Sequence, residues 1–306
     1  MHTAAPPDAP ADLAGLRDWI GRSESLHDHI GATPVLALQA TLDRPAAEVL
    51  PGTSLPCLWH WLYFLPRYRH SEAGEDGHPT HGGLLPPVPL PRRMWAGSQL
   101  QFHHPVRVGD AVQRQSRIAD VTVKAGRSGR LVFVKVQHTL HCNGAAEPAL
   151  TEFYDIVYRE ASRPDDVDPP PTAANSLATT AATTAATTDA VWQHTWLPDP
   201  LLLFRYSALT FNGHRIHYDR PYATQVEGYP GLVVHGPLIA TLLMDLLRRH
   251  LPDADVAAFR FRAVRPTFDG APMRVNGQLQ GDGKTVRLWA QDHAGWLTMD
   301  AVATLR

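Results

Sequence analysis

The clearest hydrophobic pattern in the chain follows the tripeptide His235-Gly236-Pro237. Apolar residues then recur three and four positions apart over LIATLLMDLLRRH, at Leu238, Ile239, Leu242, Leu243, Leu246 and Leu247. This spacing predicts one broad apolar stripe along an α-helix. Pro237 suits the first helical turn, and the basic residues 248–250 suit the last turn. We therefore predict one long and mostly buried helix.

The segments after this helix alternate apolar and polar residues, as half-buried strands do. They span residues 257–263, 273–280, 285–290 and 296–305. Gly-containing segments at 281–283 and 292–295 separate the last three and are typical of tight turns. One buried helix followed by an antiparallel meander predicts an α+β layer pair.

The N-terminal half shows the same kind of pattern in a weaker form. Strand-like alternation covers residues 98–102, 118–123, 131–140 and 152–159. A proline and a glycine four residues apart stand at Pro105 and Gly109, and again at Pro266 and Gly270 before the later meander. This shared spacing indicates an internal duplication. The helical candidate in this half is CLWHWLYFL, residues 57–65, which is shorter and more aromatic.

A composition shift at residues 161–190 separates two domain-sized pieces, 11–160 and 191–306. The stretch begins rich in proline and aspartate and continues as an alanine and threonine tract with one leucine and no aromatic residue. Such a segment cannot bury enough apolar surface to offset its ordering entropy. We predict an exposed linker between the two pieces.

Composition narrows the functional class. The 306 residues hold 28 Lys and Arg against 30 Asp and Glu, so the chain lacks the basic surface of a nucleic-acid-binding protein. Cys57 and Cys142 are too few for a disulfide framework or a four-thiolate zinc site. The N-terminal residues lack the pattern of a signal peptide. No uninterrupted apolar run reaches the ~18 residues that a membrane-spanning helix needs. We predict a cytoplasmic protein with no nucleic-acid or membrane partner.

The densest polar cluster is RYSALTFNGHRIHYDRPYA, residues 205–223. Within eight residues it holds Asn212, His214, His217 and Asp219, and the approach to the buried helix follows soon after. The start of a helix offers unpaired backbone N–H groups and positive potential. A nearby neutral histidine offers a base. This combination predicts an active site.

The cluster, followed by Gly-Leu-Val-Val-His-Gly-Pro-Leu, resembles the MaoC-like, R-specific enoyl-thioester hydratases, which have a hot-dog fold. It is most similar to the double-hot-dog branch related to type 2 hydroxyacyl-thioester dehydratases, which includes mesaconyl-C4-CoA and itaconyl-CoA hydratases. HHPVRVGD at residues 103–110 is a weaker signature in the first half. The resemblance implies two fused hot-dog domains, each an antiparallel sheet wrapped around a central helix.

The family motif, Asp-x-Asn-Pro-x-His-x-Asp with Tyr-Ala shortly after, can be placed on the chain residue by residue. It puts the catalytic histidine at His217, the later acid at Asp219, and the Tyr-Ala pair at Tyr222 and Ala223. The chain departs from the motif at three positions: Asn212 replaces the catalytic aspartate, His214 the asparagine and Arg215 the proline. Because Asn212 cannot titrate, the site lacks the family's carboxylate–histidine pair at this position.

Addition of water to an α,β-unsaturated thioester needs a base for the water, a proton for Cα, and stabilisation of the thioester oxygen. We predict that His217 takes the proton from water and returns it to Cα, and that the Asn212 amide holds the water. The N–H of Gly236 is the candidate donor to the enolate oxygen. Substrate contacts are predicted for Arg205, Arg215, His214 and His235, and structural support for Asp219 and Tyr222.

The resemblance implies reversible hydration of an enoyl-CoA without a metal or redox cofactor. The preferred substrate is a small C5 dicarboxylyl-CoA, mesaconyl-C4-CoA or itaconyl-CoA, with citramalyl-CoA as the product. Arg205 or Arg215 could pair with the free carboxylate of such an acyl group. The phosphates of coenzyme A could be bound by arginines outside the motif, at Arg92, Arg93, Arg260, Arg262 or Arg265. A homodimer is compatible with the resemblance.

Other interpretations of the same residues remain open. His214-x-x-His217-x-Asp219 contains the two-histidine, one-carboxylate set of non-haem iron sites, although Asn212-Gly213 argues against the helix that would bring them together. A hot-dog thioesterase would need an acid on the buried helix, where Asp245 is the only carboxylate. A non-catalytic acyl-CoA-binding module would account for Asn212. The features of the site also have structural explanations: a hydrogen-bonded histidine, an Asn-Gly turn, and a glycine needed for close packing.

Overall fold

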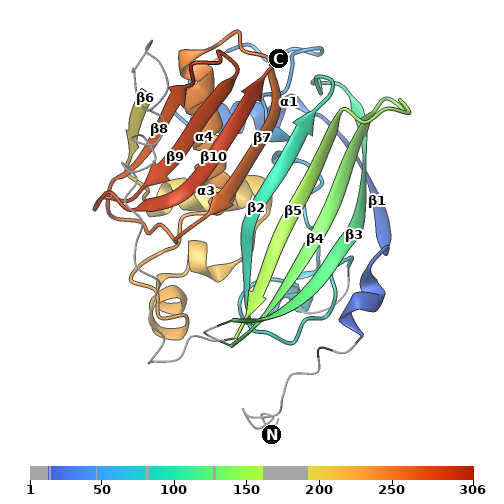
Figure 1. Cartoon of the computed structure of the whole chain (residues 1–306), viewed down its shortest axis with the longest axis vertical. Helices are drawn as coiled ribbons and strands as arrows, with labels where there is room; N and C mark the ends of the chain where they lie inside the picture. Colours follow the sequence, from blue (N-terminus) through green and yellow to red (C-terminus); the bar gives the residue numbers. More distant parts are fainter. Residues whose placement is uncertain (1–12, 14, 46, 80–82, 127–128, 161–191) are drawn as a thin grey trace, which may run out of the picture.

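The strands join edge to edge into one ten-stranded antiparallel sheet (Figure 1). The structure is a computed structural model that describes residues 13, 15–45, 47–79, 83–126, 129–160 and 192–306. The predicted linker, residues 161–190, lies outside the described residues. The first five strands are β1 (Ser23–His29), β2 (Arg92–Phe102), β3 (Ala111–Gly126), β4 (Gly129–Cys142) and β5 (Leu150–Arg159). The last five are β6 (Trp192–Trp196), β7 (Val256–Ala263), β8 (Met273–Leu279), β9 (Thr285–Gln291) and β10 (Leu297–Leu305).

The order of the strands has a mirror relation about its centre. It runs β1-β3-β4-β5-β2-β7-β10-β9-β8-β6, so each N-terminal strand has a C-terminal counterpart at the matching distance from the middle. The two halves meet where β2 pairs with β7, with Ser98 opposite Phe261 and Leu100 opposite Phe259. This arrangement matches the predicted duplication and joins the two predicted sheets into one.

The long predicted helix is α4 (Gly236–His250), which packs against β8, β9, β6 and β10. All ten residues from Leu238 to Leu247 are buried, so the helix is enclosed on every side. Its one carboxylate, Asp245, accepts hydrogen bonds from Arg44 Nε at 2.7 Å, Arg248 Nη2 at 2.8 Å and Arg249 Nε at 2.8 Å. These three guanidinium groups compensate the charge of the buried carboxylate.

Two shorter helices pack against each other beside α4. They are α1 (Ala32–Thr41) and α3 (Pro200–Thr210). Asp199 caps α3 by accepting a hydrogen bond from Leu202 N at 2.7 Å, and Phe211 ends it in the left-handed conformation at φ 50°. Single-turn helical segments are η1 (Leu16–Trp19), η2 (Trp59–Leu62), η3 (His70–Glu72) and η4 (Arg215–His217), together with the short π-helix η5 (Tyr222–Val226). No described helix is both long enough and apolar enough to cross a membrane.

The prediction of a helix at residues 57–65 is wrong. Only the 3-10 turn η2 forms there, because Leu58 at φ 72° and Phe64 at φ 54° adopt left-handed backbone on either side of it. The α-helix of this half is α1, which sequence periodicity did not reveal. Between α1 and β2, the described residues contain only the turns η2 and η3, and nothing comparable to α4. This difference leaves space against the N-terminal half of the sheet.

Candidate active site

His217 is buried, and its imidazole is oriented by a hydrogen bond. It lies at the end of η4, and its Nδ1 is 2.7 Å from the carbonyl oxygen of Val233. Since a carbonyl can only accept, Nδ1 carries the hydrogen and Nε2 keeps its lone pair. Burial lowers the pKa of His217 to about 4, which keeps the imidazole neutral and able to act as a base.

The ring of His235 packs against the ring of His217. The two rings stack with centroids 3.7 Å apart and planes inclined by 20°. His235 is fully buried, and its Nε2 is 2.8 Å from the hydroxyl of Ser207 on α3. It does not line the cavity described below, so its described contacts are with His217 and Ser207 and not with the cavity. The predicted contact of His235 with substrate stays a prediction.

Asn212 and Gly236 lie on the same cavity as His217. The Asn212 side-chain oxygen accepts a hydrogen bond from the backbone N–H of His214 at 3.0 Å, so its amide N–H groups are the donors that it can offer to a ligand. Gly236 opens α4, where first-turn N–H groups have no partner within the helix. A Cβ added to Gly236 would meet nothing within 4 Å, so this glycine is not explained by close packing.

The cavity has a volume of about 2140 Å³ and takes its walls from both halves of the chain. On the C-terminal side it is lined by Asn212, His214, His217 and Gly236. On the N-terminal side it reaches strands β3, β4 and β5, where Arg114, His138, Glu152 and Tyr154 line it. It lies against the half of the sheet where the described residues provide no counterpart of α4. The space is large enough to hold an acyl thioester together with part of its carrier.

Two predicted substrate contacts lie outside the cavity. Arg205 is exposed on α3. Arg215 donates from Nη2 to Asp219 at 2.6 Å and from Nη1 to the carbonyl oxygen of Glu75 at 2.9 Å. Neither arginine lines the cavity: Arg205 is exposed, and Arg215 is engaged by Asp219 and Glu75. The predicted pairing of either one with a substrate carboxylate is therefore not supported.

The loop that follows His217 is tied down by Asp219 and Tyr222. Asp219 Oδ1 accepts from the backbone N–H of Tyr222 at 3.1 Å, and Tyr222 donates its hydroxyl to Glu227 at 3.3 Å. Arg215 stacks over the Tyr222 ring at 4.2 Å. Because Asp219 is engaged in this way and lies outside the cavity, His214, His217 and Asp219 do not converge as a ligand set.

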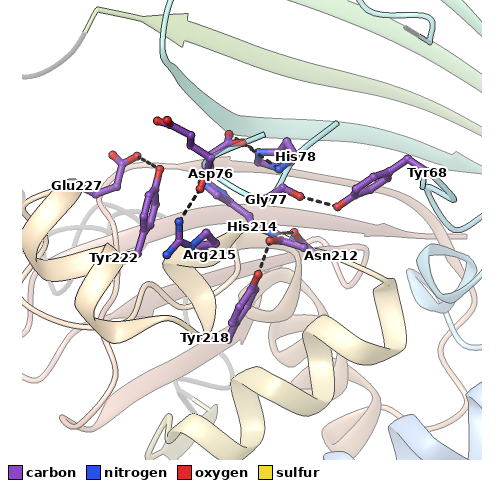
Figure 2. Close-up of polar contacts among 12 residues, drawn as sticks. Tyr68, Asp76, Gly77, His78, Asn212, His214, Arg215, Tyr218, Tyr222 and Glu227 are labelled. Carbon is purple, nitrogen blue, oxygen red and sulfur yellow. Dashed lines mark hydrogen bonds and ion pairs between the residues drawn. The ribbon is translucent and has the colours of Figure 1, made fainter. Parts of the chain in front are cut away.

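Sequence reasoning missed a second pair of polar residues, which comes from the N-terminal half (Figure 2). His78 Nδ1 donates to Asp76 Oδ2 at 2.8 Å, and the His78 ring packs on the ring of His214 with centroids 4.2 Å apart. The His214 ring in turn meets His217 edge to face at 5.4 Å. One donor atom from each of Asp76, His78 and His214 lies within 4.8 Å of the others, but the carboxylate and its imidazole already bind each other. The only sequence signal for this pair was the short spacing Asp76-Gly77-His78.

Backbone contacts dock this loop on the site. Arg215 N donates to the carbonyl oxygen of Asp76 at 2.9 Å, and the Tyr68 hydroxyl donates to that of Gly77 at 2.5 Å. Gly77, at φ +88°, lies so close to Gly213 that an added Cβ would be 1.9 Å from the Gly213 carbonyl oxygen. A glycine is therefore required at Gly77 both by the backbone conformation and by this close approach.

The buried histidines make stability dependent on pH. Burial lowers the pKa of His138 and of His217 to about 4, whereas histidines in the unfolded chain titrate near 6.5. Below pH 6.5 the unfolded chain binds more protons, so stability falls as the pH falls. We expect the free energy of unfolding to drop by about 2 kcal/mol for each of these two histidines between pH 7 and pH 5. Urea unfolding at the two pH values measures this, and equal stabilities would contradict it.

Comparisons with known proteins place the chain in a family. A family model for hydroxyacyl-thioester dehydratase type 2 matches residues 58–269. The chain is 46% identical over 295 residues to mesaconyl-C(4)-CoA hydratase of Chloroflexus aurantiacus, with 94% of this chain and 96% of that protein covered. It is 27% identical over 268 residues to the mitochondrial hydroxyacyl-thioester dehydratase type 2 of Schizosaccharomyces pombe, with 82% and 88% covered.

Solved structures share the fold. A MaoC-like dehydratase superposes with a TM-score of 0.67 at 14% identity, covering 94% of this chain and 98% of the other. A Mycobacterium tuberculosis protein described as a double hotdog fold gives 0.57 at 15% identity, with 94% and 96% covered. These likenesses confirm the predicted double hot-dog architecture. With the family model and the 46% identical relative, they show that the chain belongs to the hydroxyacyl-thioester dehydratase type 2 family.

Proposed function

We propose that this hydro-lyase catalyses the reversible hydration of a small C5 dicarboxylyl-CoA, with mesaconyl-C4-CoA as substrate and citramalyl-CoA as product. The observation that carries the reaction type is the convergence of His217, Asn212 and Gly236 on one cavity at the start of α4. The 46% identity to mesaconyl-C(4)-CoA hydratase supports the choice of acyl group. Itaconyl-CoA, whose double bond lies between Cβ and Cγ, is the second substrate of this class, and the steps below are those for mesaconyl-C4-CoA.

A residue of the site then meets each requirement of the reaction: a base for the water, a proton for Cα, and stabilisation of the thioester oxygen. His217 Nε2 takes a proton from water while the water oxygen bonds to Cβ and the C=C electrons move into the thioester carbonyl. The Asn212 amide donates a hydrogen bond that holds the water. The Gly236 N–H donates to the enolate oxygen, an interaction whose loss typically costs ~10²–10³ in rate. Protonated His217 then returns the proton to Cα, which leaves the enzyme unchanged.

The two halves divide this work. We infer that residues 191–306 carry the catalytic groups and that residues 11–160 shape the acyl pocket, since β3, β4 and β5 form its far wall. The mechanism above uses only side-chain and backbone groups, so we propose that it needs no metal or redox cofactor. The two cysteines are free thiols, in keeping with a cytoplasmic location. A homodimer stays a proposal.

Thioesterase chemistry has less support. The acid that this alternative requires is Asp245, which is bound by Arg44, Arg248 and Arg249 and does not line the cavity. A carboxylate held in this way is not available to attack a thioester or to activate water. The hydratase therefore accounts for the geometry better.

A substrate panel tests the proposal. We expect hydration, followed as loss of enoyl absorbance, to be fastest with mesaconyl-C4-CoA or itaconyl-CoA and much slower with crotonyl-CoA and longer linear enoyl-CoAs. Free thiol, measured in parallel, should not be released. Equal activity on long linear chains would contradict the dicarboxylate proposal. Thiol release would indicate a thioesterase, and tight acyl-CoA binding without turnover would indicate a binding module.

A further inference from the structure

The pair formed by Asp76 and His78 has no role in the mechanism above, although the His78 ring packs on the ring of His214 (Figure 2). His78 Nδ1 donates to the Asp76 carboxylate, so the opposite nitrogen, Nε2, is left to interact with other groups. His78, His214 and His217 follow one another along the cavity, with ring centroids 4.2 Å and then 5.4 Å apart. A ligand held at His217 therefore has His214 and His78 at its side.

Arg93 brings a permanent positive charge to the same cavity. It lies on β2, directly opposite Tyr158 of β5, and both residues line the cavity. Its neighbour Arg92 pairs with Glu227 at 3.5 Å, but among the described residues no carboxylate forms an ion pair with Arg93. Its charge lowers the pKa of both His78 and His214, so it lies within electrostatic reach of the two rings.

The structure of the proposed substrate indicates which of its groups Arg93, His214 and His78 could bind. In mesaconyl-C4-CoA the free carboxylate is attached to Cβ, the carbon that water attacks. This carboxylate must therefore lie beside the water held by His217 and Asn212. An aspartate at position 212 would place a like charge next to it, and the uncharged Asn212 avoids that repulsion.

We propose that Arg93, His214 and His78, with His78 oriented by Asp76, form the receptor for the free carboxylate of the acyl group. This inference rests on the proposed function and names the residues that give it substrate specificity. Arg93 supplies the fixed charge, and His214 and His78 supply ring nitrogens. Asp76 is a positioning residue that does not touch the substrate.

Binding of a carboxylate here is linked to proton uptake. The charged and titratable groups that face His78 are Asp76 on its own loop, His214 and His217 on the C-terminal segment, and Arg93 on β2. Burial lowers the pKa of His78, so its Nε2 is unprotonated in the free protein. A second carboxylate at this nitrogen favours the imidazolium, which then bridges Asp76 and the ligand.

Specificity ratios test the receptor. We expect Arg93→Gln and His78→Gln to lower the ratio of kcat/KM for mesaconyl-C4-CoA over crotonyl-CoA by about 10- to 100-fold, since each removes a charge-assisted contact to the carboxylate. Arg93→Lys should restore part of the ratio. Arg92→Gln is the matched control on the same strand: a contact of Arg92 with coenzyme A would affect both substrates alike and leave the ratio unchanged.

Proton uptake on ligand binding, measured by calorimetry, gives a second test. It would not change if His78 and Asp76 had only a structural role. Methylsuccinyl-CoA, linked through C4, and isovaleryl-CoA are unreactive and differ only in a carboxylate against a methyl group. In two buffers of different ionisation enthalpy at pH 7.5, we expect proton uptake on binding the first and none with the second. Uptake should disappear in His78→Gln and diminish in Asp76→Asn, whose single amide oxygen can still accept from the His78 ring but which carries no charge.

The outcomes separate the two proposals. If the wild-type protein hydrates mesaconyl-C4-CoA but the ratio is unchanged in both Arg93→Gln and His78→Gln, the receptor is wrong and the proposed function stands. If the wild-type protein does not hydrate mesaconyl-C4-CoA, the proposed function itself fails. A substrate preference that is lost on treatment with EDTA and returns with Zn²⁺ would also overturn the receptor.

Discussion

Replacing His217 with asparagine is expected to lower kcat for hydration by about 10³-fold, within the range that general acid–base catalysis contributes. An asparagine side chain can still donate a hydrogen bond to the carbonyl oxygen of Val233, as Nδ1 of His217 does at 2.7 Å. It cannot accept the proton from water. The change therefore removes the base while retaining the local hydrogen bond, and steady-state kinetics at pH 7.5 measures the loss.

His70→Ala is the control for this variant, because His70 is exposed on η3 and lies outside the cavity. Its activity should stay within twofold of wild type. Near-ultraviolet circular dichroism of His217→Asn should match that of the wild-type protein. A correctly folded His217→Asn protein with a rate within tenfold of wild type would rule out His217 as the base and direct attention to His78.

The C-terminal half could be predicted well because its signals are local. The leucine spacing of α4 repeats with the helical period over the whole buried helix, and the strands after it alternate with period two. Asn212 and His217 are close in sequence, and Gly236 is fixed by the start of α4. Local pattern therefore brings these groups to one cavity without any knowledge of long-range pairing.

Side-chain direction was harder to predict. Arg205 and Arg215 lie within the motif region, yet α3 exposes one and Asp219 binds the other. His235 is adjacent to Gly236, but its ring turns inward to stack on His217. Proximity in sequence says nothing about which side of a helix or a turn a side chain occupies, and here that side decides between binding substrate and supporting the base.

The contribution of the N-terminal half could not be predicted because it depends on contacts between distant segments. Asp76 and His78 reach the site only through the docking of their loop on residues 212–215. Arg93 joins them because β2 lies at the centre of the sheet, next to β7. The predicted helix at residues 57–65 failed for a similar reason: two left-handed residues, Leu58 and Phe64, interrupt an otherwise suitable apolar sequence.

Substitution of Gly77 with alanine is expected to lower kcat/KM for mesaconyl-C4-CoA by about 10²-fold, the scale of loss when a group is misplaced by about 1 Å. The new Cβ would lie 1.9 Å from the carbonyl oxygen of Gly213, so the loop cannot stay docked. His78 would then leave His214, and residues 212–217 would lose a backbone support. The left-handed alanine costs about 1 kcal/mol of global stability, and the lost docking contacts add to this cost.

Gly52→Ala separates backbone strain from the clash. Gly52 has φ +89°, almost the same as Gly77 at +88°, but an added Cβ would meet nothing within 4 Å there. Both variants carry the same left-handed strain, so the urea midpoint should fall in both. It should fall further in Gly77→Ala, whose loop also loses its docking contacts, and only Gly77→Ala should lose activity. If the two proteins were equally active, the contact between the loop of His78 and the segment of His217 would have no bearing on catalysis. A loss confined to Gly77→Ala would show that docking of this N-terminal loop on residues 212–217 contributes to catalysis.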